Sequence, residues 1–273
     1  MGAVKIPSSS YAIIGGSSTY SINFPEDINR YVKVLEKDLV FNTPWGESPP
    51  FKLFALGDKR VLTLKMHGWR PGVARADASR QVFWVFKQAG VKKIIAEGGV
   101  GSINHLLKPR DLLVATDYLD FSMRKDVSLD GAYLLTMRQP VCPLLRDKLV
   151  VAAENHSVGR VFDRGVYAVT DGRHFESEAE VQMMSRMGAD IVGQSMCPEV
   201  YLAREIGACY ARIDMVVNYA EGVVQQWEHR ELKDIFYNEA ERIGTIVLEA
   251  IAEADEDDWS CGCRELRKET LLK

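Results

Sequence analysis

Small and polar residues follow several apolar runs of this 273-residue sequence, at points where strands of a sheet would end. They lie at Gly15 to Ser18, His67 to Arg70, Gly98 to Ser102, Phe175 with Glu176, Gln194 with Ser195, and Asn218. Glycine-rich turns that carry hydroxyl groups suit an oxyanion, because backbone N–H groups approach it without an intervening side chain. If these strand ends converge, the residues form one pocket.

The elements that must position these residues alternate between strand-like and helix-like patterns. We predict strands near 11–16, 61–66, 91–96, 166–170, 189–195 and 209–218, and helices at 77–89, around 179–187, at 199–206 and around 236–250. The run EGGVGS, 97–102, is predicted to be a loop at the carboxyl end of a strand, where open α/β sheets bind ligands. The alternation predicts an α/β fold with three layers, α/β/α, around a central mixed, largely parallel twisted sheet.

The domain organisation follows from length and composition. One domain over residues 1–273 is the simplest account, with 253–273 as an acidic C-terminal tail that is solvated or frayed. A net charge of −4 offers no footprint for nucleic acid or for an anionic membrane surface, so we expect a small-molecule partner. No apolar run approaches the ~20 residues that span a bilayer, and the N-terminus lacks a signal-peptide core, so we expect a cytoplasmic protein with reduced thiols.

Metal ligation is not expected from the sequence. The five histidines show no paired ligand spacing, and the only cysteines close in sequence are Cys261 and Cys263. That C-x-C pair is either a redox or thiol-exchange element or part of an inert tail, and we favour the inert tail.

Several motifs occur together in a fixed order. They are IIGGSS, FNTPWGESP at 41–49, KMHG, GGVGS, DGRHFESEAE at 171–180, GADIVGQSMCPEVYLARE at 188–205 and MVVNYAEG at 215–222. Over 11–251 the chain resembles the trimeric purine nucleoside phosphorylases, including the methylthioadenosine and methylthioinosine phosphorylases. The resemblance implies cleavage of the bond between a purine and its ribose by inorganic phosphate as co-substrate, without a cofactor, in a homotrimer or dimer of trimers.

The resemblance assigns a base site to three residues. Asn218 matches the amide that hydrogen-bonds the base near its position 7 and serves as a catalytic residue, since the departing purine gains negative charge. Phe175 matches an aromatic residue that packs on the purine face, and Glu176 matches the carboxylate that accepts from the ring N–H of a 6-oxopurine. Members that prefer adenine carry an acid where Asn218 stands, so hypoxanthine or guanine is expected here. The alternative readings are that Asn218 ends a strand and that Glu176 is a first-turn helix carboxylate.

The resemblance also assigns the phosphate site. Ser17, His67, the backbone of Gly99 and Ser195 fall on phosphate-contacting positions, with His67 counted as catalytic. The family normally has an arginine beside this histidine, whereas this chain has Met66, preceded by Lys65. Lys65 or Arg70 is the candidate replacement, although a lysine is a point charge and not a bidentate fork.

Two further departures concern the sugar. Gln194 replaces a methionine that packs on the ribose, which predicts a more polar sugar face, and Trp69 either walls the sugar pocket or belongs to the core. Leu134 aligns with a histidine that reaches the 5′ position across the trimer interface, and a leucine favours an apolar 5′ group such as methylthio.

Three functions remain open at this point. The first is a phosphorylase acting on inosine, guanosine or 5′-methylthioinosine. The second is a nucleosidase that uses water, motivated by the missing arginine. The third is a noncatalytic purine-binding protein that has kept the pocket.

Overall fold

Buried apolar runs form the centre of the sheet in the computed structural model, which describes residues 5–28, 31–65 and 68–271. The central strands β1 (Tyr11–Ile14), β7 (Lys93–Ser102) and β14 (Cys209–Tyr219) are parallel, and every residue of β1 and β14 is buried. Strands that are buried on both faces are typical of a sheet that helices cover on both sides.

The sheet continues outward from these three strands. Within the described residues it holds eleven strands, with the main path in the order β11-β8-β14-β7-β1-β6-β5-β2 and with β13 linking β12 and β9 to β7. The other members are β2 (Val32–Leu39), β5 (Phe51–Leu56), β6 (Lys59–Leu64), β8 (Leu112–Leu113), β9 (Asp117–Asp120), β11 (Val161–Phe162), β12 (Val166–Val169) and β13 (Ile191–Gly193). Two small pairs lie outside it, β3 (Asn42–Thr43) with β4 (Gly46–Glu47) and β10 (Tyr133–Leu135) with β15 (Arg267–Glu269).

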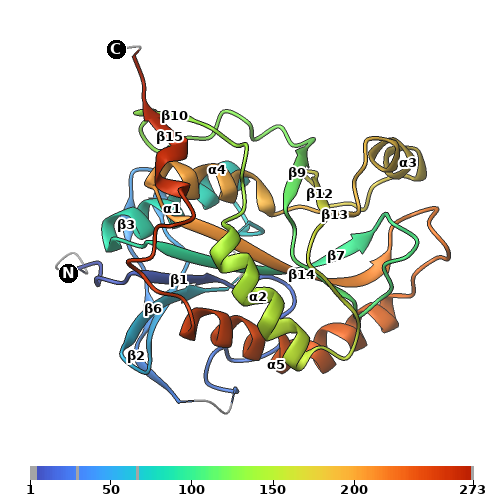
Figure 1. Ribbon diagram of the computed structural model, residues 1–273, viewed down its shortest axis with the longest axis horizontal. Coiled ribbons are helices and arrows are strands. Elements are labelled where there is room, and N and C mark those ends of the chain that lie inside the picture. The colour runs from blue at the N-terminus through green and yellow to red at the C-terminus, as the bar shows by residue number, and fades with distance from the viewer. Residues whose placement is uncertain (1–4, 29–30, 66–67, 272–273) are drawn as a thin grey trace.

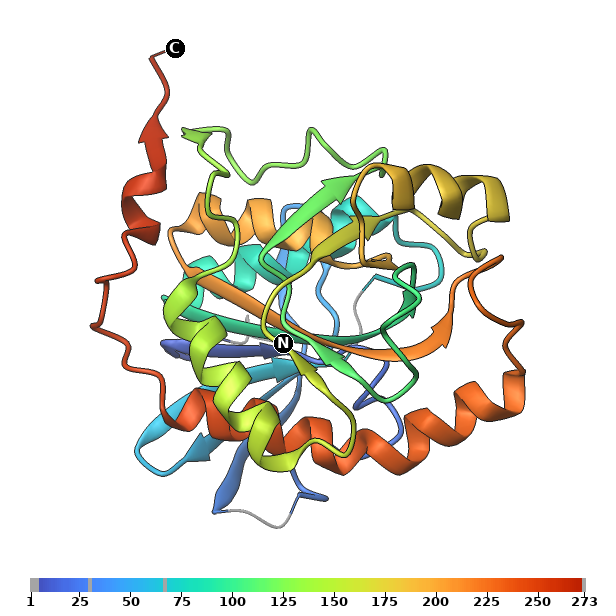
Figure 2. The same ribbon diagram turned by 45° about the vertical axis from the view of Figure 1, so that its right-hand side comes forward.

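Helices cover both faces of the sheet (Figure 1). On one face α1 (Arg75–Ala89) packs against α4 (Met196–Ile206), and on the other α2 (Pro143–His156) packs against the long α5 (His229–Ala252). The short α3 (Glu178–Arg186) lies to one side, and a 3-10 turn, η1 (Cys263–Leu266), precedes β15. Figure 2 shows α5 running below the sheet beside α2. The predicted mixed, largely parallel sheet between helices is confirmed.

The helix α1 illustrates how the sequence sets an element. Its buried residues include Ala78, Val82 and Phe86, spaced at helical intervals along one face. It ends at Gly90, which adopts φ 79°, a conformation that glycine reaches at little cost, and the Gly90 N–H donates to the Phe86 and Lys87 carbonyls. The predicted range of 77–89 is therefore two residues short at the N-terminus.

Two predictions need correction. The run 97–102 is not a loop: it completes β7, and its residues pair with β14 up to Ser102 opposite Tyr219. The C-terminal segment is not a frayed tail, because Ala254 and Cys263 are buried and β15 pairs with β10. In the described part of the chain, no helix combines the length and apolar character needed to cross a membrane.

Candidate active site

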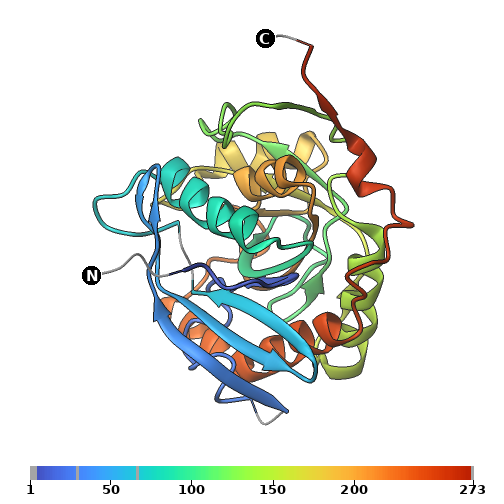
Figure 3. The same cartoon turned by 90° about the vertical axis from the view of Figure 1, so that its left-hand side faces the viewer.

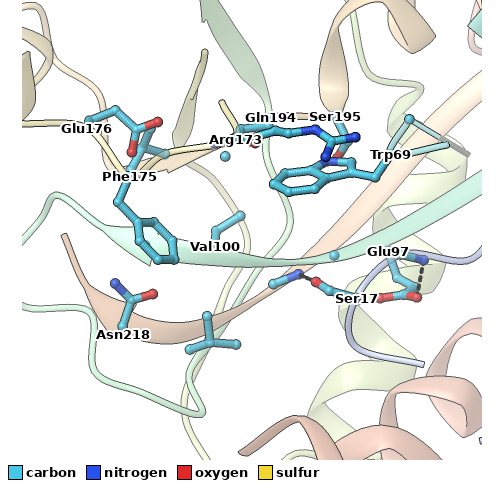
Figure 4. Close-up of a pocket in the computed structure, with 18 of the residues that line it drawn as sticks. Ser17, Trp69, Glu97, Val100, Arg173, Phe175, Glu176, Gln194, Ser195 and Asn218 are labelled. Carbon is cyan, nitrogen blue, oxygen red and sulfur yellow. Dashed lines mark hydrogen bonds between the residues drawn. The ribbon is translucent and has the colours of Figure 1, made fainter. Parts of the chain in front are cut away.

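A cavity of about 460 Å³ lies where the chain leaves β1, β7, β12, β13 and β14. Its wall includes Ser17, Trp69, the glycines of β7, Phe175, Glu176, Gln194, Ser195 and Asn218. Figure 4 shows these side chains around one space, with Phe175 between Glu176 and Asn218. Residues that are more than 200 positions apart in sequence thus share one site, as the strand-end pattern predicted.

One end of the cavity combines an aromatic face with two hydrogen-bonding groups. Phe175 is 52% exposed, and its ring packs edge-on against Trp227 with the ring centroids 4.8 Å apart. Glu176 is buried, and its Oε1 accepts from the Thr170 hydroxyl at 2.5 Å. An aromatic face flanked by a carboxylate and an amide suits a flat heterocycle that carries ring N–H groups.

Asn218 supplies the amide at this end. Its Nδ2 donates to the Tyr219 carbonyl at 2.7 Å, whereas its Oδ1 is buried and accepts from no described group. A buried acceptor without a donor costs free energy, on the order of 1–3 kcal/mol. Asn218 itself lines the cavity, where a bound molecule with an N–H group would supply the missing donor.

An irregularity in β14 positions this amide. Val216 lies opposite Val100, but Asn218 lies opposite Gly101, so one extra residue is inserted into β14 between them. Such a bulge changes which side chains face a given side of the strand. Both Val217 and Asn218 consequently line the cavity.

The glycine turn after β1 binds a carboxylate of the protein itself. The buried Glu97, from β7, accepts from the N–H groups of Gly16, Ser18 and Thr19 and from the Thr19 hydroxyl. Burial raises the pKa of Glu97, while these donors act to lower it. The predicted oxyanion-binding amides are thus engaged within the fold.

Ser17 is the exception in this turn. Its Oγ accepts from the Gly99 N–H at 2.9 Å, so the serine proton is directed elsewhere and Ser17 acts as a donor. A side chain on Gly99 would overlap Phe236 and Ser17, which explains glycine at this position. Ser17 and Gly99, which the resemblance assigns to the phosphate site, therefore lie together in the cavity wall.

The opposite wall carries Gln194, Ser195 and Trp69. Ser195 directly precedes α4, whose first residues are not regular helix because Cys197 has an extended backbone (φ −104°, ψ 134°). The Gln194 Nε2 donates to the His174 carbonyl at 3.1 Å, and its Oε1 is buried without a partner among the described groups. Trp69 is 40% exposed and lines the cavity, which favours the pocket-wall reading over the core reading.

Three guanidinium groups around this wall were missed by sequence reasoning. Arg75, from α1, donates to the carbonyls of Asp171 and Gln194, and burial lowers its pKa to about 10, which leaves it charged at neutral pH. Arg124 donates to the Thr170 carbonyl at 2.9 Å and forms an ion pair of 2.7 Å with Asp171. The guanidinium carbons of Arg75 and Arg173 both lie 5.6 Å from the Trp69 ring centroid.

The cations proposed from sequence lie elsewhere. Lys65 is exposed, and its ammonium donates to the Tyr20 carbonyl at 3.2 Å and packs over the Tyr20 ring. Arg70 binds the Gln81 side chain at 2.5 Å and the Glu47 carbonyl at 3.0 Å. Neither residue lines the cavity, so the expectation that one of them supplies its charge needs correction.

Two other predicted site residues, His67 and Leu134, are not among the described residues that line the cavity. His67 lies outside the described residues, as does Met66 beside it. Leu134 is described, but it lies on β10, is 69% exposed and does not line the cavity.

A buried ionic cluster supports the floor of the site. Arg212 and Asp214 on β14 form an ion pair of 2.5 Å with both side chains fully buried, and Glu199 accepts from the Tyr210 hydroxyl at 2.8 Å. Burial raises the pKa of Glu199 to about 7 and also raises that of Asp214, against the opposing effect of Arg212. A Cβ on Gly98 would lie 2.9 Å from the Arg212 Nη2, so the cluster reaches the back of the β7 glycines.

Sequence patterns give little indication that the three arginines and Trp227 belong to the site. Arg173 stands two positions before Phe175 in the DGRHFESEAE motif, so the motif itself points to it. Arg75 and Arg124 reach the cavity from α1 and from a loop, and no site residue was predicted from the sequence in either segment. Trp227 becomes a neighbour of Phe175 only through the fold.

Comparison with known proteins agrees with this geometry. The phosphorylase superfamily matches residues 10–252. The chain is 32% identical to the 6-oxopurine nucleoside phosphorylase of Pyrococcus furiosus, with 94% of this chain and 97% of that protein covered. It is 29% identical to the S-methyl-5′-thioadenosine phosphorylase of Pyrococcus horikoshii, with 94% and 96% covered.

A solved structure shows the same fold. The methylthioadenosine phosphorylase of Schistosoma mansoni in complex with adenine is similar with a TM-score of 0.78 at 25% identity, over 94% of this chain and 98% of that one. The matched region holds every residue that lines the cavity. The chain therefore belongs to the phosphorylase superfamily, as one of its nucleoside phosphorylases, which are pentosyltransferases.

Proposed function

We propose that the cavity binds a 6-oxopurine nucleoside and that inorganic phosphate cleaves its N-glycosidic bond, giving the free base and ribose 1-phosphate. The observation that carries the base assignment is that Asn218 lines the same cavity as Phe175 and Glu176 while its buried Oδ1 has no partner among the described groups. N7 of the purine carries no proton in the nucleoside, so this oxygen accepts only once N7 takes up a proton from solvent, which neutralises the negative charge that develops on the departing purine.

Glu176 selects the 6-oxopurine. One of its oxygens is held by the Thr170 hydroxyl, which fixes the carboxylate and leaves the other oxygen to accept from a ring N–H of the base. Adenine offers no such N–H, so an adenine ring would leave a buried carboxylate oxygen unpaired, at a cost of about 1–3 kcal/mol.

Phosphate binds at the opposite end of the cavity. Ser17 donates from the glycine turn and Ser195 donates at the start of α4. The guanidinium groups of Arg75, Arg124 and Arg173 supply the positive charge of the wall. The base and phosphate sites then lie on either side of the glycosidic bond, and Gln194 and Trp69 face the sugar.

The 5′ end of the sugar and the assembly belong to the same proposal. We infer a homotrimer or a dimer of trimers in which Leu134, exposed on β10, reaches the neighbouring cavity and favours an apolar 5′ substituent. Light scattering coupled to size-exclusion chromatography measures the mass of the assembly directly, and a monomer at assay concentration contradicts a shared site.

The decisive experiment separates three outcomes. Inosine, guanosine, 5′-methylthioinosine and adenosine are incubated with the protein in the presence and absence of phosphate, and the products are separated by chromatography. Release of hypoxanthine or guanine only with phosphate, together with a sugar 1-phosphate, supports the proposal. Free ribose in phosphate-free buffer identifies a nucleosidase, and binding measured by calorimetry without turnover identifies a noncatalytic protein.

A further inference from the structure

Four of the five cysteines converge at one point remote from the cavity. They are Cys142 just before α2, Cys209 at the start of β14, Cys261 two positions before η1, and Cys263 at the first residue of η1. Their four Sγ atoms all lie within 4.8 Å of one another, and three of the four residues are buried, Cys261 being partly exposed. Figure 3 shows the C-terminal segment rising from the end of α5 past α2 towards the C-terminus. Its two cysteines lie beside Cys142 and Cys209.

The distances fit a shared metal ion better than disulfide bonds. Cys209 and Cys261 have their Sγ atoms 3.6 Å apart, far above the ~2.05 Å of a disulfide bond. Four sulfurs that each lie about 2.3 Å from a central zinc ion, at the corners of a tetrahedron, are about 3.8 Å from one another. The cluster needs only small side-chain movements to reach this arrangement.

Positively charged or donor groups lie beside two of the four sulfurs. The N–H of Leu145, in the first turn of α2, donates to the Cys142 sulfur, so the positive end of a helix faces this ligand. The ammonium of Lys93, which is almost fully buried, lies 3.6 Å from the Cys209 sulfur and compensates part of the negative charge of a tetrathiolate site. Lys93 is held in place by the Asp258 carbonyl and by the Trp259 ring, with its Nζ 4.2 Å from the ring centroid.

We propose that Cys142, Cys209, Cys261 and Cys263 bind one Zn²⁺ ion in a closed, four-coordinate structural site. Four sulfur donors with no oxygen or nitrogen ligand select a borderline-soft divalent ion, and four protein ligands leave no open position for substrate. The sequence-based expectation of no metal rested on the spacing of the five histidines and on the C-x-C pair alone among the cysteines, because the other two cysteines lie more than 50 positions away from that pair.

The site joins three parts of the fold. Side-chain hydrogen bonds already hold the C-terminal segment in place: the Arg204 guanidinium of α4 donates to the Cys263 carbonyl at 2.9 Å, and the Gln139 amide donates to the Cys261 carbonyl at 3.1 Å. A metal at the cluster fixes the C-terminal segment to the start of β14, the strand whose other end carries Asn218. The expected effect is on stability, since binding to the folded state alone shifts the unfolding equilibrium.

Metal analysis tests the proposal. The full-length protein is purified without a metal-affinity resin or chelator, and its metals are measured by plasma mass spectrometry, with one zinc per chain expected. Cys261→Ser, at the most exposed ligand, should lose the zinc and melt at a lower temperature. Cys197→Ser is the matched control, because Cys197 is buried but lies outside the cluster, and it should retain the full zinc content.

Measurements on the unmodified protein test the proposal even if a cysteine variant does not fold. Replacement of zinc by Co²⁺ should produce the absorption bands of a tetrahedral tetrathiolate complex. A metal-free protein whose unreduced mass is lower by four hydrogen atoms contains two disulfides and overturns the proposal. Metal-free protein with titratable thiols, or iron in place of zinc, overturns it as well.

Discussion

Replacing Asn218 by aspartate tests the base site directly. Asn218 lines the cavity and its buried Oδ1 has no partner among the described residues, so we expect its hydrogen bond to form when the base is bound. An ionised aspartate at this position places a second carboxylate beside Glu176 and repels the charge that develops on the purine. A protonated aspartate instead turns a donor toward the base or toward the Tyr219 carbonyl.

The size of the effect follows from the single hydrogen bond at stake. A hydrogen bond to a group that becomes charged contributes about 1.5–3 kcal/mol, which corresponds to a ~10-fold to ~150-fold loss in kcat/KM for inosine. Most of the loss should appear in kcat, because the interaction strengthens in the transition state. Adenosine should lose less than inosine, so the preference between the two substrates shifts toward the 6-aminopurine.

The assay follows hypoxanthine and adenine release by chromatography at several substrate concentrations with saturating phosphate. Asn42→Asp is the matched control, since Asn42 is exposed on β3 and lies outside the cavity, and it should retain the parent rates. If Asn218→Asp folds normally and its kcat/KM for inosine stays within about twofold of the parent, Asn218 does not contact the base and the reasoning fails.

Three further predictions follow from the same cavity and its floor. Glu176→Gln should lower kcat/KM about tenfold or more for inosine but not for adenosine. The control Glu178→Gln, at an exposed residue of α3, should leave kcat/KM unchanged for both nucleosides. Equal losses for the two nucleosides in Glu176→Gln would contradict a contact with the ring N–H. Burial raises the pKa of Glu199 from 4.5 to about 7, so between these pH values the native state keeps a proton that the unfolded chain releases. The free energy of unfolding should therefore fall as pH rises from 4.5 to 7, by on the order of 3 kcal/mol. Urea titrations at several pH values should show this slope reduced in Glu199→Gln, and an unchanged slope would refute the assignment. Arg212→Met should cost about 3–5 kcal/mol of stability by leaving Asp214 buried and unpaired, and Arg212→Met combined with Asp214→Leu should recover part of it; a double variant less stable than the single one would contradict this account.

Much of the fold is readable from local sequence. The helix at 77–89 and the strand at 209–218 were predicted within two residues of α1 and β14, because apolar spacing and a terminal glycine determine such elements locally. The α2 helix was not anticipated, and its apolar face is shared with α5, far away in sequence.

The glycines of β7 show why local rules fail at the site. Consecutive glycines predict a loop, yet 97–102 forms a strand, since neighbours on both faces demand residues without side chains: Phe236 lies against Gly99 and Arg212 against Gly98. This close packing is a property of the tertiary structure. The positive charge of the cavity wall likewise depends on the tertiary structure. Arg75 supplies it in place of the predicted Lys65 or Arg70, because the fold brings α1 to the Gln194 carbonyl.

The contact between Glu97 and the glycine turn has a consequence for ligand affinity. Because the fold itself holds the amides of Gly16, Ser18 and Thr19, the turn has its final shape before any anion arrives. Association with the cavity then requires little loss of backbone freedom at this wall, which is the benefit of preorganisation. Substitutions in the turn should therefore change the melting temperature as well as the apparent affinity for the anion, so the two quantities should vary together across a series of variants.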